Sequence, residues 1–267
     1  MRMMVLVSAM SCTCPVFADL VADLATDVLP SLQSGWAYFP YGCNAGVPET
    51  SVYFPGPEFM VMDTMGIRPQ SCQAANRLEY RIDPVLIERG TYRAETRARV
   101  TDSEFFVYQY GFSFGGYLDD KVVSIGLMTD TLSLPDLSMM PWDATGWHDY
   151  AIVYQLPGYE FELWIDGQFF LTGPARDIDP YPNTFIIGDS TGGANARVEI
   201  ASYHAELVLA CNAADLVPPF NLLDLADINA FVTGFVSLDP IADLNADGLF
   251  DLLDVNIFVG SFLAGCP

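Results

Sequence analysis

The chain has 267 residues, of which 51% are hydrophobic, and its 34 acidic residues outnumber its 11 basic ones to give a formal net charge of −23. This length fits one large domain with a small companion, and the apolar fraction is ample for a buried core, which excludes a disordered chain. Because no basic patch is available to meet phosphates, we also exclude nucleic acid as a partner.

Residues 1–18 have the pattern of a secretory signal peptide. Arg2 supplies a charged start, an apolar run extends from Met3 to Met10, and Ala18 ends a group of small residues suited to cleavage. An alternative is a lipoprotein signal with Cys12 as its anchor. No segment has about 20 consecutive apolar residues, so we expect no transmembrane segment in the mature chain and a secreted or cell-surface location.

Residues 19–208 alternate between apolar and polar residues and are punctuated by turn residues, which predicts β-strands. In Thr91–Val100 the charged residues Arg93, Glu95, Arg97 and Arg99 share one face. The other expected strands are Ser51–Phe54, Glu58–Asp63, Arg77–Ile82, Glu104–Tyr110, Val122–Leu127 and Tyr150–Tyr154. An Asp-Gly pair at 166–167 between two apolar runs indicates a type I′ hairpin. The pattern as a whole predicts a twisted antiparallel β-sandwich.

The order of four segments in this region, Trp147–Val153, Glu162–Gly167, Phe185–Asp189 and Arg197–Tyr203, resembles LamG-like jelly rolls of the concanavalin A type. The resemblance covers about residues 90–208. It implies a concanavalin A-like jelly-roll β-sandwich that binds glycan or protein through loops at one edge or across a concave face. The fold alone does not decide between these ligands.

Two patterns in this region invite a comparison with enzymes. The Gly-x-Ser-x-Gly pattern around Ser113 fits the nucleophile elbow of serine hydrolases, but the residues after it predict a turn and a strand where the elbow needs a helix. Glu160, Glu162 and Asp166 share a strand face and are a candidate acid pair of a glycosidase. The hairpin turn accounts for Asp166, so we expect no catalytic residue and interpret the acidic face as solvated.

The histidines and tryptophans favour structural roles. His148 and His204 have no metal-binding spacing around them, and each lies in a strand-like segment. The four tryptophans would suit stacking on sugars, but aromatic residues in sandwiches more often pack in the core or on the sheet.

A twelve-residue loop near the C-terminus has the spacing that wraps a chain around a hard cation. Side-chain oxygens stand at positions 1, 3, 5, 9 and 12, which are Asp243, Asn245, Asp247, Asp251 and Asp254. Gly248 at position 6 permits a sharp turn, and Leu249 at position 7 would offer its backbone carbonyl. We therefore predict a Ca²⁺ site with these six residues as ligands.

The loop and the residues after it repeat every 27 residues, so that Asp227 aligns with Asp254 and Asp224 with Asp251. Apolar residues follow each loop at helical spacing, which predicts two helices. The pattern resembles a type I dockerin over about residues 209–267, with EF-hand-type calcium loops. The resemblance implies first-loop ligands Asp215, Asp224 and Asp227 and a cohesin-like or cell-surface protein partner. Asn221 aligns with Gly248 and tolerates the same left-handed turn.

Four cysteines remain after residues 1–18: Cys43, Cys72, Cys211 and Cys266. An even number in an exported chain predicts disulfides, with three possible pairings. We expect Cys43–Cys72 and Cys211–Cys266, because the second pair brackets the two repeats and, in the dockerin resemblance, lies where the first loop meets the end of the second helix.

Together these patterns predict a signal peptide (residues 1–18), a concanavalin A-like β-sandwich (residues 19–208) and a dockerin-like calcium-binding module (residues 209–267). We expect a non-catalytic protein whose sandwich recognises an extracellular polysaccharide or protein and whose C-terminal module anchors it. The alternative is a secreted polysaccharide-degrading glycoside hydrolase of the same superfamily.

Overall fold

The computed structural model describes residues 20–42, 44–67, 74–82, 89–105, 111–118, 120–156, 158, 160–189 and 194–266. The expected signal peptide, the expected Cys43–Cys72 bridge and residues 106–110 of an expected strand lie outside these ranges. The chain divides into two compact units. Their described parts are residues 20–208, which we call the sandwich unit, and residues 209–266, which we call the helical unit.

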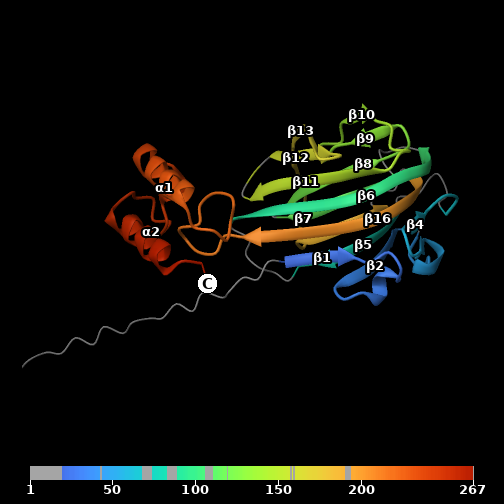
Figure 1. Ribbon diagram of the computed structural model, residues 1–267, viewed down its shortest axis with the longest axis horizontal. Helices are drawn as coiled ribbons and strands as arrows, with labels where there is room; N and C mark the ends of the chain where they lie inside the picture. Colours follow the sequence, from blue (N-terminus) through green and yellow to red (C-terminus); the bar gives the residue numbers. More distant parts are fainter. Residues whose placement is uncertain are drawn as a thin grey trace, which may run out of the picture. The chain divides into compact units, whose positions relative to one another are not determined.

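The sandwich unit consists of two antiparallel sheets (Figure 1). The first, which we call the β6 sheet, has the order β13 (Gln168–Pro174), β12 (Glu160–Ile165), β11 (His148–Leu156), β6 (Gly90–Phe105), β16 (Ala194–Leu209), β4 (Met60–Asp63) and β3 (Tyr53–Phe54), with β1 (Leu20–Leu24) also paired to β16. The second has the order β10 (Met139–Pro141), β9 (Thr131–Ser133), β8 (Lys121–Leu127), β7 (Phe112–Leu118), β15 (Thr184–Asp189), β5 (Ala74–Arg81) and β2 (Trp36–Gly42), with β14 (Arg176–Asp177) paired to β8. Single 3₁₀ turns lie at Pro30–Leu32 and Glu49–Ser51.

Alternation along β6 shows why the two sheets face each other. Tyr92, Ala94, Ala98 and Val100 are fully buried, whereas the charged residues between them point to the outer face. Across the core the ring of Tyr92 stacks on Phe185 of β15 at 5.3 Å between centroids. Burying one face of each strand drives the sheets together. The predicted antiparallel jelly-roll sandwich is therefore confirmed.

Two local predictions concern turns and strands of the sandwich unit. Asp166 and Gly167 have φ angles of 52° and 73°, as a type I′ hairpin turn requires, and they join β12 to β13. Ser113 lies within β7, is fully buried and donates its hydroxyl to the carbonyl of Gly188 at 3.1 Å. Strand β7 continues to Leu118 without a helix, so the Gly-x-Ser-x-Gly pattern is a strand.

The helical unit contains α1 (Leu225–Ser237), α2 (Leu252–Ala264) and a 3₁₀ turn at Pro240–Ala242 (Figure 1). Asp224 and Asp251 cap the two helices, each within a capping box. The rings of Phe231 and Phe258 stack at 4.2 Å in a core that also includes Ala214, Leu216 and Ala242. Both predicted helices are present, and their apolar faces meet as their spacing indicated.

Within the part of the chain that the structure describes, no helix has the length and apolar character needed to cross a membrane.

Candidate functional site

A groove of about 660 Å³ lies in the β6 sheet of the sandwich unit. Its lining comes from four neighbouring strands, β12, β11, β6 and β16, and from the turn between β12 and β13. Neighbouring strands are about 4.8 Å apart, so a groove that crosses four of them is roughly 15 Å long. It therefore has the length to hold an extended ligand that runs across the strands.

The register of three strands explains why the sheet is hollow there. Ala151 of β11 pairs with Glu95 of β6 on one side and with Trp164 of β12 on the other. Directly opposite residues on neighbouring strands point to the same face. A methyl group thus stands between an indole ring and a longer carboxylate side chain. The small Ala151 side chain makes the floor of the groove.

Ion pairs form the polar part of the lining. Arg93 pairs with Glu95 within β6, and Nη1 of Arg97 lies 2.7 Å from Oδ2 of Asp149 on β11. These four side chains are between 42% and 58% exposed, a range in which ion pairs contribute little to stability. Their main effect is to hold hydrogen-bond donors and acceptors side by side in fixed positions at the groove.

The hairpin turn supplies a further carboxylate. One oxygen of Asp166 accepts the backbone N–H of Asp149 at 3.0 Å, and the other lies 2.8 Å from Nδ1 of His148. The backbone N–H of Asp149, with help from the His148 side chain, holds the pKa of Asp166 below its usual value. Asp166 is therefore ionised at neutral pH and accepts hydrogen bonds.

Among the four tryptophans, Trp164 lines the groove. Its indole N–H donates to Oε2 of Glu162 at 2.9 Å, which fixes the ring on the outer face of β12. Trp147 directly precedes β11, and the guanidinium carbon of Arg99 lies 5.0 Å from its ring centroid. Trp36 is buried, and Trp142 donates to the hydroxyl of Tyr150. The structural role expected for the tryptophans thus holds for three, while Trp164 faces the groove.

The sequence-derived acid pair is only partly brought to the groove. Asp166 belongs to the lining, but among the described residues that form it neither Glu160 nor Glu162 is present. Sequence reasoning missed Ala151 and Asp149. Only the register between neighbouring strands identifies these two residues. The alternation of charges along β6 identified the outer face of that strand, but not the residues of the next strand that lie beside it.

In the second loop of the helical unit, backbone N–H groups orient the side-chain oxygens. Oδ2 of Asp243 accepts from the N–H of Gly248 at 2.9 Å, and Oδ1 of Asn245 accepts from that of Asp247 at 3.0 Å. Oδ1 of Asp247 accepts from the N–H of Leu249 at 2.8 Å. Gly248 has a φ of 78°, as the sharp turn requires. The donor set, all oxygen and mostly carboxylate, fits a hard cation such as Ca²⁺.

Asp254 closes the same loop. Its two oxygens accept the backbone N–H groups of Asp251 at 3.0 Å and Leu244 at 2.8 Å. These hydrogen bonds lower the pKa of Asp254, and the bond from Asp251 contributes most. Asp254 therefore stays ionised. Residues 209–267 contain eight aspartates and no Lys, Arg or His, so these carboxylates have no side-chain cation of their own unit to neutralise them.

The first loop repeats much of this backbone geometry. Oδ2 of the buried Asp215 accepts from the N–H of Asn221 at 2.7 Å, as Asp243 does from Gly248, and Asn221 has a φ of 65°. Asp227 accepts from the N–H groups of Leu216 and Asp224. Asp254 accepts in the same way from Leu244 and Asp251 in the second loop. Apolar residues replace the middle ligands, and a Ca²⁺ ion held by Asp215, Asp224 and Asp227 stays a prediction.

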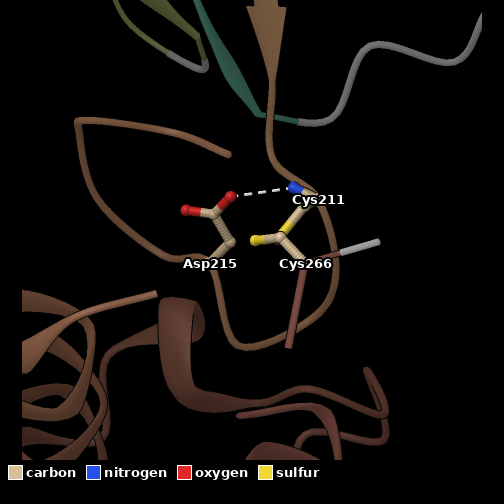
Figure 2. A group of neighbouring side chains, drawn as sticks. All are labelled: Cys211, Asp215 and Cys266. Atoms are coloured by element: carbon tan, nitrogen blue, oxygen red, sulfur yellow. Dashed lines mark hydrogen bonds between the residues drawn. A yellow bond between two sulfur atoms is a disulfide. The ribbon is translucent and has the colours of Figure 1, made fainter. Parts of the chain in front are cut away.

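A disulfide links Cys211 to Cys266, the pairing expected from the sequence, with 5.4 Å between the Cα atoms. Figure 2 shows Asp215 beside the two cysteines, with a hydrogen bond of 2.8 Å from the N–H of Cys211 to its carboxylate. Cysteine sulfurs and a carboxylate gather here within 4.8 Å of one another, but the sulfurs are joined to each other. The group is a covalent junction between the start of the first loop and the end of α2.

No family model and no curated protein matches the chain. Among solved structures, it is similar to the lectin-like defense protein arcelin-5 from Phaseolus vulgaris, with 6% identity over 72% of this chain and 99% of that one and a TM-score of 0.43. Peanut lectin, solved with a 9mer peptide, has 12% identity over 72% of this chain and 99% of the lectin chain, with a TM-score of 0.44. An endo-β-galactosidase from Clostridium perfringens that releases GlcNAcα1-4Gal has 12% identity over 73% and 65%, with a TM-score of 0.44. Likeness at this level concerns the fold alone.

Proposed function

We propose that the chain is a non-catalytic binding protein of the extracellular space. Its sandwich unit holds a glycan in the groove of the β6 sheet, and its helical unit binds Ca²⁺ and anchors the protein. The observation that carries the proposal is the hollow at Ala151, between Trp164 and Glu95, surrounded by fixed polar groups.

Sugar hydroxyls suit this lining because each hydroxyl both donates and accepts a hydrogen bond. The Arg97–Asp149 pair presents donors and acceptors side by side, and Asp166 adds a further acceptor. The indole ring of Trp164 offers an apolar surface on which a sugar ring can pack while its hydroxyls reach the charged groups. Both kinds of contact are therefore available within one groove.

The environment of one groove carboxylate, Asp166, does not suit a general acid, which supports a non-catalytic role. A glycosidase needs a carboxylic acid whose pKa is raised, so that it can give a proton to the leaving group. The pKa of Asp166 is lowered instead, chiefly by the N–H of Asp149. Glu162 accepts a hydrogen bond from Trp164 and is exposed.

For the helical unit we propose a Ca²⁺ ion at the second loop, held by the ligands Asp243, Asn245, Asp247, Leu249, Asp251 and Asp254. The ion would supply the positive charge that residues 209–267 lack. The exposed apolar side chains of α1 and α2, such as Val236 (78% exposed) and Leu263 (80% exposed), support contact with a cohesin-like or cell-surface protein.

The glycan proposal is tested by screening the full-length protein on a glycan array and repeating the screen with Ala151→Gln, which fills the hollow. Ala37→Gln is the matched control, because Ala37 is an exposed alanine on β2 of the other sheet. We expect glycan binding that Ala151→Gln abolishes and Ala37→Gln preserves. Binding that survives Ala151→Gln would place the ligand elsewhere and contradict the proposal.

A polysaccharide hydrolase is the second candidate, because the carboxylates of Glu95, Asp149 and Asp166 gather in the groove. Incubation with the polysaccharides bound in the array, followed by measurement of new reducing ends, separates the two functions. Under the binding proposal no reducing ends appear. If they do appear, and Glu95→Gln or Glu162→Gln removes them, the protein is a hydrolase.

A further inference from the structure

We infer that the ligand of the groove is an uncharged polysaccharide and not a polyanionic one. The inference rests on the proposed glycan binding and specifies its chemical class. It comes from the balance and the pairing of charges around the hollow at Ala151.

The groove has no surplus positive charge. Its lining contains two arginines, Arg93 and Arg97, against three carboxylates, Glu95, Asp149 and Asp166, so two positive charges stand against three negative ones. Both arginines are already paired with carboxylates of the same lining. The formal charge of the whole chain, −23, has the same sign as this local excess.

The neighbouring cations do not reverse this balance. Arg99, one outward residue further along β6, lies with its Nε 2.6 Å from Oε2 of Glu199. His148, next to the groove, lies beside Asp166, and His204, one outward residue beyond Ser202 on β16, has Asp23 and Glu206 as its partners. A uronate or sulfate group that entered the groove would have to displace a protein carboxylate from its arginine. It would leave that carboxylate unpaired beside a second negative charge, which costs free energy.

Uncharged sugars meet no such penalty. A pair of neighbouring hydroxyls can hydrogen-bond to an arginine and its carboxylate together without separating them, because each hydroxyl is both donor and acceptor. The row Trp164–Ala151–Glu95 runs across the strands through the hollow. A linear chain lying along this row would pack one ring on Trp164 and place the next over Ala151.

The test uses two cellulose derivatives with the same backbone, hydroxyethylcellulose and carboxymethylcellulose, together with a neutral galactomannan and the polyanions alginate and polygalacturonate. Affinity gel electrophoresis of the full-length protein gives the dissociation constant for each polymer. We expect at least one neutral polymer to bind, and each polyanion to bind at least about tenfold more weakly at low salt, with the difference narrowing at high salt.

Variants connect the result to the groove. Ala151→Gln and Trp164→Ala should each abolish neutral binding, and Ala37→Gln should not. Asp149→Asn combined with Glu95→Gln removes two negative charges and should strengthen binding of polyanions relative to neutral polymers. Tryptophan fluorescence during urea unfolding checks that each variant is folded.

The outcomes separate the two proposals. Groove-dependent binding that favours alginate, polygalacturonate or carboxymethylcellulose overturns the inference about charge and leaves glycan binding intact. Failure to bind any polymer or any glycan of the array overturns the proposed function, and this inference with it.

Discussion

Replacement of Cys211 and Cys266 by alanine removes the covalent junction of the helical unit, and the size of the effect can be worked out from the structure. The bridge spans a sequence separation of 55 residues. In the chain-entropy model, closing a loop of that length stabilises the folded state by about 4 kcal/mol. Small domains have a total stability of this order, so we expect the helical unit of the double variant to be marginally stable.

The two units can be followed separately in the full-length protein. All four tryptophans lie in the sandwich unit, and both α-helices of the described chain lie in the helical unit. Urea unfolding monitored by tryptophan fluorescence therefore reports the first unit, and far-ultraviolet circular dichroism in the helical band reports mainly the second. With an m value of about 1 kcal/mol per molar urea, the loss of about 4 kcal/mol moves the helical transition down by roughly 4 M.

A matched control separates the covalent bond from the hydrogen bonds beside it. The side-chain amide of Asn212 donates to the carbonyls of Ser261 and Gly265, and its oxygen accepts from the N–H of Ala214. Asn212→Ala therefore breaks three hydrogen bonds at the same junction and keeps the disulfide. We expect that variant to lose about 1–3 kcal/mol. The stabilising role of the disulfide is refuted if the cysteine variant loses less stability than the Asn212 variant. It is also refuted if the urea midpoint of the tryptophan transition falls as far as that of the helical transition.

Three further predictions use the same two probes. Ca²⁺ at a hundredfold excess over its dissociation constant should stabilise the helical unit by about 2.7 kcal/mol, and both a chelator and Asp243→Asn should remove the effect. Urea unfolding curves that superimpose with and without chelator would exclude the site. The hydrogen bond with Asp23 raises the pKa of His204 above its usual value, so the pair's contribution to sandwich stability is complete below about pH 6.5 and disappears as the pH rises through the raised pKa. The difference in urea midpoint between wild type and His204→Gln should shrink over that range. A difference that widens would contradict the assignment. Phe231→Ala removes the ring that stacks on Phe258 at 4.2 Å, and it should destabilise the helical unit by about 3–5 kcal/mol while the tryptophan transition stays in place. An unchanged helical transition would show that the stack is dispensable.

Local patterns predicted the elements whose residues are close in sequence. The alternation in Thr91–Val100 identified both the strand and the charged outer face of β6, and the Asp-Gly pair identified the turn after β12. Helical spacing of apolar residues located α1 and α2, because an amphipathic helix carries its own periodicity.

The groove was not predictable in this way, because it depends on register between distant segments. Glu95, Ala151 and Trp164 form one row only because β6, β11 and β12 align at those residues, and a shift of one residue would turn Ala151 into the core. The pairing of β1 with β16 is similar: it brings Asp23 to His204 from the other end of the chain. No local pattern in either strand carries that information.

The composition and the disulfide of the helical unit together affect how the protein resists proteases. Arg197 is the last arginine or lysine of the chain, so proteases of the trypsin type, which cut after those residues, have no bond to attack from residue 198 to the end. A protease of another type that cut one exposed loop between Cys211 and Cys266 would leave both pieces joined through the sulfurs. The C-terminal part of the chain should thus persist in protease-rich surroundings as one connected fragment.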